Sequence, residues 1–425
     1  MIILLATLHF LFGVYIIFFE LIKMKNQRID FMSFVMIFYS LFFGIAPALL
    51  HGANIFFYKN IWTVYTNYNT QHYFIAFILV VATYYSILAG WKVSSLKKRT
   101  TKRSDTQRNI KNLEIIAWLF FALAIITYTL YSKAYGGYTG LLEKSESIRG
   151  GWVNVYNPWS FLQRFGGFSL VSSYLFFSLL FSKEYQKKVS TKLGFLLSFL
   201  VSLYVVITWG GRLTLATYII TFPLTLILYK NKKIRLKKLS VIFLITFLVL
   251  YFGSGLLSSI NNYVSGSNQI ENLNNSNKSI IDFFIDEFSF PTISVVVSLN
   301  SIYNNVIEMR FFKDFPLAVV HLVPKSLIGF LPEKISTINT QLFDRGFHGE
   351  IPTDIISLGI YNIGVFGPVV LGFLLGYFSN MIQLSLSTIS FSNLRLMLFV
   401  VIGLTIGKTV AYADPANFLN GNFCI

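Results

Sequence analysis

The stretch TWGGRLTLATYII, residues 208–220, places a single arginine, Arg212, between two long apolar runs. Residues 193–209 lie before it and residues 213–229 after it, and each run has about the length of a helix that crosses a bilayer. The two glycines that precede the arginine permit a tight backbone turn. The stretch therefore predicts two membrane helices joined by a turn, with Arg212 at the mouth of the bundle.

The composition of the whole chain also indicates a membrane protein. Of its 425 residues, 54% are hydrophobic and 12% are charged, and the mean hydropathy is +0.62. A soluble domain carries about 25% charged residues. The apolar runs do not alternate with polar residues, which disfavours a membrane barrel. We expect an all-α bundle of about ten membrane helices, at residues 2–22, 31–50, 73–91, 113–132, 165–182, 193–209, 213–229, 239–257, 355–378 and 396–412.

Lysine and arginine residues predict the orientation of this bundle. They concentrate in every second loop, at residues 23–30, 92–112, 183–192 and 230–238, and loops rich in these residues stay in the cytoplasm. Both chain ends and Arg212 are therefore expected on the outer side. The net charge of +17 is then a topology signal. It does not indicate nucleic-acid binding, because the basic loops are short and have no aromatic platform for bases.

The predicted helices divide the chain into three parts. Residues 1–257 hold the first eight, residues 258–354 form one large periplasmic loop, and residues 355–425 hold the last two and a short tail. Charges interrupt the apolar residues of segment 280–331, which indicates short helices that lie on or dip into the membrane surface. Residues 291–307 could instead form a short span followed by another, for roughly eleven or twelve in all.

Several basic residues lie at the expected outer level of the bundle. Guanidinium groups bind phosphate oxygens bidentately and stay charged, so a lipid-linked diphosphate would supply their counter-ion. The alternative for each is an interfacial side chain that extends to the lipid headgroups. The candidates for diphosphate binding are Arg149, Arg164, Arg212, Arg310, Lys325 and Arg345.

Other chemistries have weaker support. The chain has one cysteine, Cys424, and five histidines without a metal-ligand spacing, so neither a disulfide nor a metal site is expected. The predicted helices are nearly free of charge, which argues against a transporter, because ionisable residues inside the membrane mark ion and proton paths. Polar groups collected on one outer face favour an enzyme that works at the membrane surface without a cofactor.

Three segments resemble a known family. WGGRLTLATYII, HLVPKSLIGFLPEK and GEIPTDIISLGIYNIGVFGPVVLGFLLGYF, in this order and with one large late loop, are similar to the bacterial oligosaccharide repeat-unit polymerases, the Wzy-type O-antigen and capsule polymerases. The resemblance implies a membrane glycosyltransferase of the GT-C class in the bacterial inner (cytoplasmic) membrane, acting at the periplasmic face. It implies metal-independent transfer of a growing glycan from undecaprenyl diphosphate to a new lipid-linked repeat unit. A chain-length-determining co-polymerase is the implied partner in lipopolysaccharide or capsule biosynthesis.

Two other functions stay open at this point. The O-antigen ligases have a similar layout but usually begin the matching late segment with a His-Asn pair, where this chain reads Pro352-Thr353-Asp354. A flippase or exporter of lipid-linked glycans would have internal repeats and charges lining the bundle, and the sequence shows neither.

The implied reaction needs a base, because a sugar hydroxyl attacks an anomeric carbon while lipid diphosphate departs. The candidates at the mouth of the ninth predicted span are, in order, Asp354, Glu350 and His348. Asp354 also suits a helix N-cap, Glu350 a solvated loop and His348 an ordinary surface position. Trp152 and Trp159 are candidates to stack on sugar rings, and are otherwise part of an interfacial aromatic belt.

Overall fold

The computed structural model of the protein is helical throughout the part it describes, with no strand there. It describes residues 1–26, 29–55, 70–96, 109–149, 155–209, 211–230, 244, 246–253, 280–323, 329–343 and 350–424. The helices of the first 230 residues are α1 (Ile2–Asn26), α2 (Phe31–Ser40), the π-helix η1 (Leu41–Ile45), α3 (Ala46–Ile55), α4 (Thr70–Ser95), α5 (Asn109–Lys133), α6 (Gly137–Glu143), α7 (Ser145–Arg149), the 3-10 helix η3 (Ser160–Gly167), α8 (Phe168–Leu180), α9 (Val189–Trp209) and α10 (Arg212–Lys230).

The later part of the chain mixes short helices with long ones. From residue 280 onward they are α12 (Ile280–Phe288), α13 (Phe290–Tyr303), α14 (Asp314–Val320), α16 (Ile335–Phe343), α17 (Ile355–Ile363), the 3-10 helix η5 (Gly364–Phe366), α18 (Gly367–Leu386), α19 (Ser392–Lys408) and α20 (Pro415–Gly421).

Seven helical segments among the described residues are long and apolar enough to cross a membrane, which characterises a multi-pass membrane protein. Six of them coincide with predicted spans and confirm these as long apolar helices. The seventh contains the predicted span at 355–378. The seven segments are Ile2–Lys25, Phe31–Ala53, Gln71–Ser95, Asn112–Lys133, Val189–Trp209, Arg212–Tyr229 and Ile355–Leu386.

The other predicted spans fall on shorter helices or outside the described residues. The span at 165–182 falls on η3 and on α8, which has 13 residues. The span at 396–412 falls on α19, which has 17 residues. Within 239–257 the chain is helical at residues 246–253, and most of the remainder lies outside the described ranges. The total number of crossings therefore stays a prediction.

The apolar segment Ile355–Leu386 consists of two helices that pack against each other. Between α17 and α18 the backbone passes through Gly364 at φ 67°, a conformation that favours glycine. A Cβ atom built on Gly359 would lie 2.4 Å from the backbone nitrogen of Pro368, whereas residues this far apart in one straight helix would be well separated. The chain therefore turns back at Gly364, and α18 alone supplies the membrane-length helix.

Part of the large loop is packed into the bundle. The 14-residue α13 is buried along nearly its whole length and contacts α4, α16 and α17. Asn339 on α16 connects α13 with α17, because it donates to the Ser294 hydroxyl at 3.1 Å and accepts from the Tyr361 hydroxyl at 2.9 Å. The segment thus enters the bundle and does not lie flat on its surface, as the sequence had left open.

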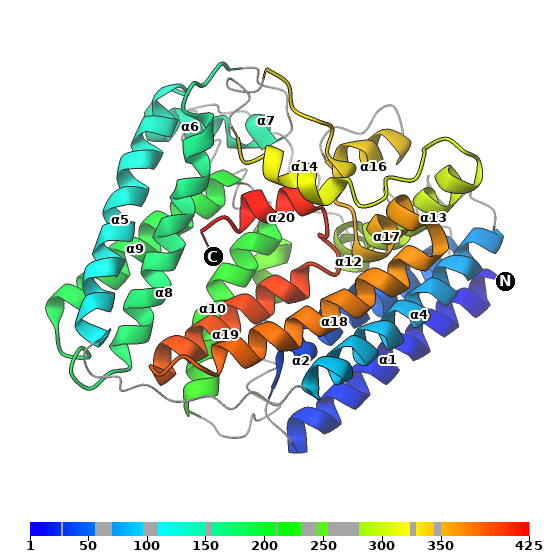
Figure 1. The fold of residues 1–425 in the computed structure, drawn as a ribbon, viewed down its shortest axis with the longest axis horizontal. Helices are drawn as coiled ribbons and strands as arrows, with labels where there is room; N and C mark the ends of the chain where they lie inside the picture. Colours follow the sequence, from blue (N-terminus) through cyan, green and yellow to red (C-terminus); the bar gives the residue numbers. More distant parts are fainter. Residues whose placement is uncertain are drawn as a thin grey trace.

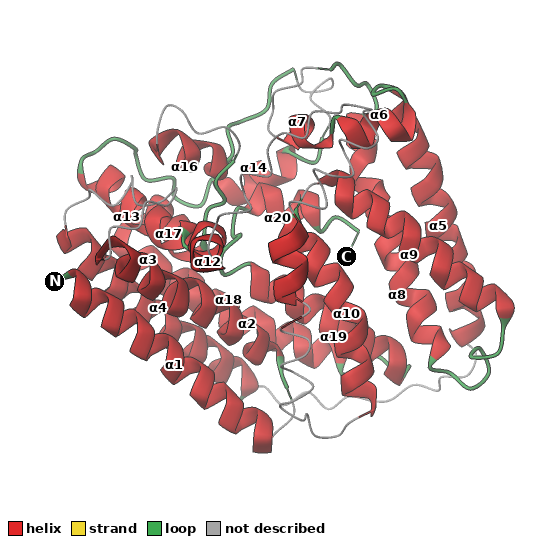
Figure 2. Ribbon diagram, turned by 180° about the vertical axis from the view of Figure 1, so that it is seen from behind, coloured by secondary structure: helices red, strands yellow, loops and turns green. Residues whose placement is uncertain are grey.

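The long helices form two groups, with α10 and α19 between them. Figures 1 and 2 show α1, α2, α4 and α18 together at one side and α5, α8 and α9 at the other. The short helices α6, α7, α14, α16 and α20 gather at one end of both groups. Within the first group α4 and α18 are in direct backbone contact, since a Cβ atom on Gly376 would lie 2.0 Å from the Ile87 carbonyl oxygen.

A π-helix interrupts the second predicted span. It joins α2 to α3 beside two buried histidines, His9 on α1 and His51 on α3, whose ring centroids are 5.7 Å apart. The Nδ1 atom of His9 donates to the carbonyl oxygen of Phe43 within the π-helix at 2.7 Å. The π-helix therefore lies where the His9 ring, the His51 ring and the Phe43 carbonyl meet.

Candidate functional site

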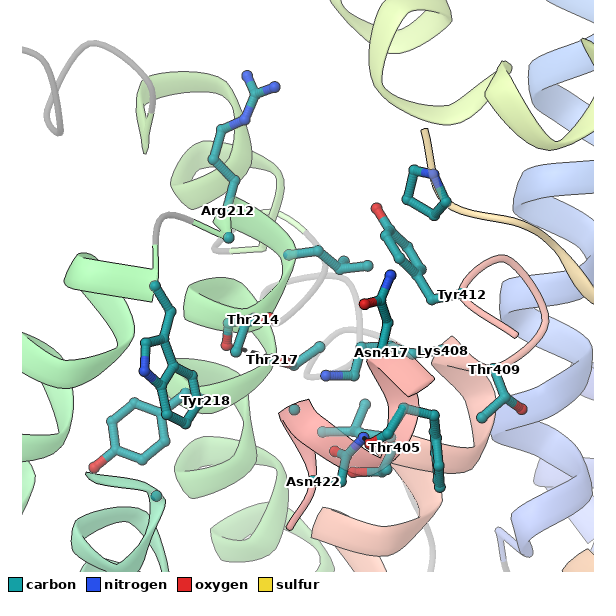
Figure 3. A pocket seen from close by; sticks show the side chains of 18 of the residues that line it. Arg212, Thr214, Thr217, Tyr218, Thr405, Lys408, Thr409, Tyr412, Asn417 and Asn422 are labelled. Carbon is teal, nitrogen blue, oxygen red and sulfur yellow. Dashed lines mark hydrogen bonds between the residues drawn. The ribbon is translucent and has the colours of Figure 1, made fainter. Parts of the chain in front are cut away.

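A cavity of about 1140 Å³ lies between α10 and α19. Residues of η3, α8, α12, α16 and α20 complete its walls, and we refer to it as the α10–α19 cavity. Figure 3 shows Lys408 extending from α19 toward α10, with Arg212 at another level of the same space. The charged and polar side chains that line the cavity include Arg164, Arg212, Thr214, Thr217, Thr221, Asp286, Glu287, Lys334, Thr337, Glu350, Thr405, Lys408, Thr409, Tyr412, Asn417 and Asn422.

Arg212 lies where the sequence predicts, at the first residue of α10 directly after the end of α9. Its Nη2 atom lies 2.7 Å from the Oε2 atom of Glu287 on α12. The side chain of Arg212 is 33% exposed and that of Glu287 is 12% exposed. The guanidinium therefore faces the cavity and holds a carboxylate there. The ion pair therefore connects α10 with α12, a helix of the predicted large loop.

Arg164 is the second predicted cation that lines the cavity. It lies on η3, and its two terminal nitrogens donate to the carbonyl oxygens of His321 and Leu322, the latter at 2.6 Å. These carbonyls are at the C-terminal end of α14, where a cation is favourable. Arg164 therefore fastens α14 to the bundle as well as contributing charge to the cavity.

The predicted bases separate in the structure. Glu350 lines the cavity, accepts from the ammonium of Lys334 at 3.2 Å and from the Asn417 amide at 3.1 Å, and its side chain is 41% exposed. Asp354 is fully buried and is not among the residues that line the cavity. His348 lies outside the described residues.

Asp354 is the N-cap of α17, which confirms the alternative that the sequence offered. Its carboxylate accepts from the backbone nitrogens of Ile356 at 2.8 Å and Ser357 at 3.0 Å, and bonds the Ser357 hydroxyl. Burial raises the pKa of this carboxyl to about 7. Asp354 therefore caps α17 and does not line the α10–α19 cavity, and its predicted role as a base stays a prediction.

Of the other predicted site residues, Arg310 and Trp159 are described and do not line the cavity. Arg310 forms a two-bonded ion pair with Asp314 on α14, with its Nε and Nη2 atoms at 2.8 and 2.7 Å from the carboxylate. Trp159 is 43% exposed and its ring contacts Phe161. Arg149 ends α7, and its side chain is not described. Outside the described residues lie Trp152, Lys325 and Arg345.

Four charged residues that line the cavity were not predicted as site residues from the sequence. Asp286 and Glu287 lie on α12, whose sequence IIDFFIDEF shows one polar face on a short helix. Lys408 is the last residue of α19, and Lys334 precedes α16. The signal for Lys408 was available, because it follows an unbroken apolar run on the predicted outer side. The sequence could not predict that Lys408 and Arg212 line the same cavity, because the two residues lie on separate helices.

The cavity combines cations, carboxylates and hydroxyls with an apolar wall that includes Leu170, Val401 and Leu404. Such a site suits an amphiphilic ligand with an anionic head. The described residues contain no group of three or more histidine, cysteine or acidic side chains placed to hold a metal ion. No protein-family model, curated protein or solved structure matches the chain.

Proposed function

We propose that the protein is a glycan polymerase of the bacterial inner membrane. It transfers a growing undecaprenyl-diphosphate-linked O-antigen or capsule chain to a new lipid-linked repeat unit at the periplasmic face. The observation that carries this proposal is the ion pair of Arg212 with Glu287 inside a cavity lined by both charged and apolar residues. The resemblance of three sequence segments to the repeat-unit polymerases supports it independently.

The charge distribution supports a location on the outer side. Arg212 begins α10, and the basic loop at residues 230–238 follows the other end of that helix. Since basic loops stay in the cytoplasm, the cavity opens at the opposite surface. The N-terminus of α10 also faces the cavity through Gly211, and helix N-termini attract anions. A lipid diphosphate at this surface would meet both the helix end and the guanidinium.

The reaction can be written with the groups present. The oxygen of an acceptor hydroxyl forms a bond to the anomeric carbon of the growing chain. The bond from that carbon to the diphosphate oxygen breaks, and its electron pair leaves with the diphosphate. Arg212 stabilises the charge that develops on the leaving group. The hydroxyl proton passes to a carboxylate, for which Glu287 is the first candidate because it is already held beside the guanidinium.

Binding of the diphosphate would also prepare this carboxylate. An arginine partner favours the ionised form of a carboxylate and lowers its basicity. When the guanidinium turns from Glu287 to the phosphate oxygens, the carboxylate loses part of that stabilisation and becomes a better proton acceptor. Glu350 is the second candidate for the base, and it lies at the same cavity with Lys334 as its partner.

A deletion strain tests the proposal directly. Surface polysaccharide from the strain that carries the gene should show a ladder of polymer on a gel, and the deletion strain should show only single repeat units. Complementation with the intact gene should restore the ladder, and complementation with Arg212→Ala should not. Core without any repeat unit would indicate a ligase instead. An unchanged ladder in the deletion strain would overturn the proposal.

A further inference from the structure

Lys408 differs from the other cations of the α10–α19 cavity. Arg212 and Lys334 each form an ion pair with a carboxylate, and Arg164 donates to two backbone carbonyls. Across the described ranges, no acidic side chain lies within ion-pair distance of Lys408. The residue is half-buried, and its side chain points into the cavity (Figure 3).

An unpaired charge at this place is unfavourable for the empty protein. Removing an ammonium from water costs free energy unless an opposite charge compensates, and the cost is larger within a membrane bundle. The C-terminal end of α19 offers partial compensation through its carbonyl groups. A ligand with negative charge would supply the missing counter-ion, and the cavity gives such a ligand access.

Two hydroxyl groups extend the polar face on which Lys408 lies. Thr405 precedes it by three positions and Tyr412 follows it by four, and the helical turn continues because the Tyr412 backbone nitrogen donates to the Lys408 carbonyl at 3.0 Å. Positions with this spacing share one helix face. Within the described part of the chain, no hydrogen bond engages either hydroxyl. Leu404 and Val401 line the cavity further along α19, away from its C-terminal end.

The two cations lie at different levels of the cavity. Figure 3 shows the Tyr412 side chain between the levels of Arg212 and Lys408, and Tyr412 interacts electrostatically with Arg212 and Glu287. On α19, Lys408 lies one turn before Tyr412, closer to the apolar Leu404. An anion that touched both cations would therefore need two charged groups, the inner one next to the lipid-like wall.

We propose that Lys408, with the hydroxyls of Thr405 and Tyr412, binds the phosphate nearer the lipid chain of a polyprenyl diphosphate, while Arg212 binds the outer phosphate. The ammonium acts as a point charge on one phosphate group, and the two hydroxyls donate to its remaining oxygens. The assignment of a lipid diphosphate as ligand rests on the proposed function. The assignment of an anion to Lys408 rests on the unpaired charge alone.

The test measures binding of farnesyl diphosphate to the full-length protein purified in detergent, by isothermal titration calorimetry. Lys408→Met should weaken binding by about 10- to 150-fold, which corresponds to the loss of one charge-assisted contact. Lys408→Arg keeps the charge and should retain most of the affinity. Lys188→Met is the matched control, because Lys188 does not line the cavity and its charge is already engaged by Glu114, and its affinity should stay close to that of the unmodified protein.

Thermal unfolding of the ligand-free protein separates ligand binding from a structural role. If Lys408 is an uncompensated charge, Lys408→Met should unfold at a higher temperature than the unmodified protein while it binds less well. A residue that serves to stabilise the end of α19 would give the opposite sign. Thr405→Val, which keeps the volume of the side chain, provides a second measurement should Lys408→Met fail to fold, and it too should weaken binding. Unchanged affinity in both variants overturns the proposal.

Two further probes identify the part of the ligand that matters. Farnesyl monophosphate should bind more weakly than the diphosphate and should lose little affinity in Arg212→Ala, because only the inner phosphate site is filled. Inorganic diphosphate that bound as tightly as farnesyl diphosphate would overturn the lipid assignment. A normal polysaccharide ladder in the deletion strain, combined with loss of farnesyl diphosphate binding in Lys408→Met, would refute the polymerase and leave this binding site established.

Discussion

Two helix pairs of this protein differ in how closely their backbones approach. At the contact of α4 with α18, glycines bring the backbones together, and a Cβ atom on Gly90 would lie 2.0 Å from the Phe373 carbonyl oxygen. At the contact of α10 with α19, the helices enclose a cavity of about 1140 Å³ with charges and hydroxyls on its walls. Small residues permit close approach in a membrane, whereas charged residues need space for water or a ligand.

The comparison shows where function can be looked for in a bundle whose helices are nearly all apolar. At Gly90 and Gly376 the α4–α18 contact leaves no room even for a Cβ atom, and these glycines serve stability. At its predicted outer end the α10–α19 contact is not closely packed, and charged residues line the space between the helices. Variants at the first contact should therefore affect folding, and variants at the second should affect binding and catalysis while the protein still folds.

The largest effect is expected at the α4–α18 contact, where the two backbones are already in direct contact. Gly376→Leu should abolish the folded protein, because even a Cβ atom there meets the backbone of Ile87 and a larger side chain would force α4 and α18 apart. Overpacking of this kind typically costs about 1–3 kcal/mol or more. The measurement is the fraction of monodisperse protein on size-exclusion chromatography after extraction in detergent. Gly52→Ala is the control, because among the described residues no atom outside its own helix turn lies within 4 Å of a Cβ atom at that position, and it should elute like the unmodified protein.

The second effect concerns the carboxylates of the cavity. Glu287→Gln keeps a hydrogen bond to Arg212 but removes the proton acceptor, so the rate of polymerisation should fall by about 10²- to 10⁴-fold, the usual contribution of a general base. The assay follows chain extension by purified protein in liposomes with lipid-linked repeat units. Glu350→Gln is made in parallel. Loss of the rate in that variant and not in Glu287→Gln would transfer the role of base to Glu350.

The third effect concerns Arg212 itself. Arg212→Ala should lower the rate of polymerisation by about 10- to 150-fold, which follows from the loss of roughly 1.5–3 kcal/mol for a charge-assisted contact. Arg212→Lys should also be poor, since lysine cannot form the planar two-bonded contact. Because removal of the arginine breaks the ion pair with Glu287, the double variant Arg212→Ala with Glu287→Ala controls for folding. It should recover protein yield without recovering activity, and an active Arg212→Ala protein would count against the proposed role.

The smallest effect on polymerisation is expected at Asp354, which lies outside both regions compared. Its carboxyl has a pKa of about 7 in the folded protein because of burial, above the ordinary value of about 3.9 that holds in the unfolded chain. The folded state therefore prefers the neutral carboxyl, and stability declines as the pH rises from about 4 to 7. Asp354→Asn caps the helix equally well and does not ionise.

The measurement for Asp354→Asn is thermal unfolding between pH 5 and pH 8. The variant should gain stability relative to the unmodified protein as the pH rises, by up to about 1.4 kcal/mol per pH unit below pH 7. Polymerisation should continue in the variant, because the cavity does not include this residue. A constant difference at all pH values would show that the carboxyl is ionised throughout, and loss of polymerisation would restore Asp354 as the base.

Much of the helical layout follows from the sequence, because a long apolar run needs only its own residues to form a membrane helix. The helices around Arg212 are an example. The N-cap at Asp354 was also open to prediction, since capping depends on neighbouring residues. The site was less accessible. Glu287 meets Arg212, and Lys408 meets α10, through packing of helices that are far apart in the chain, and no local pattern specifies which faces will meet.

The fold of the segment after Asp354 shows the same limit. An unbroken apolar run predicts one helix, but a single glycine at φ 67°, Gly364, permits the chain to turn back so that α17 packs on α18. Apolar length alone does not distinguish one long span from a short helix folded onto a span. The buried position of α13 has the same cause, because its apolar residues suit the interior of a bundle as well as the lipid.

The π-helix at Leu41–Ile45 has a consequence for how this chain tolerates insertions and deletions. A π-helical turn holds one more residue than an α-helical turn. Deleting one residue from Leu41–Ile45 would therefore restore a regular α-helical turn and leave the residues after it on nearly the same face of the helix. His51 would then stay close to His9. The π-helix thus absorbs a single extra residue, and homologues that are one residue shorter at this point would present the same helix face to the bundle.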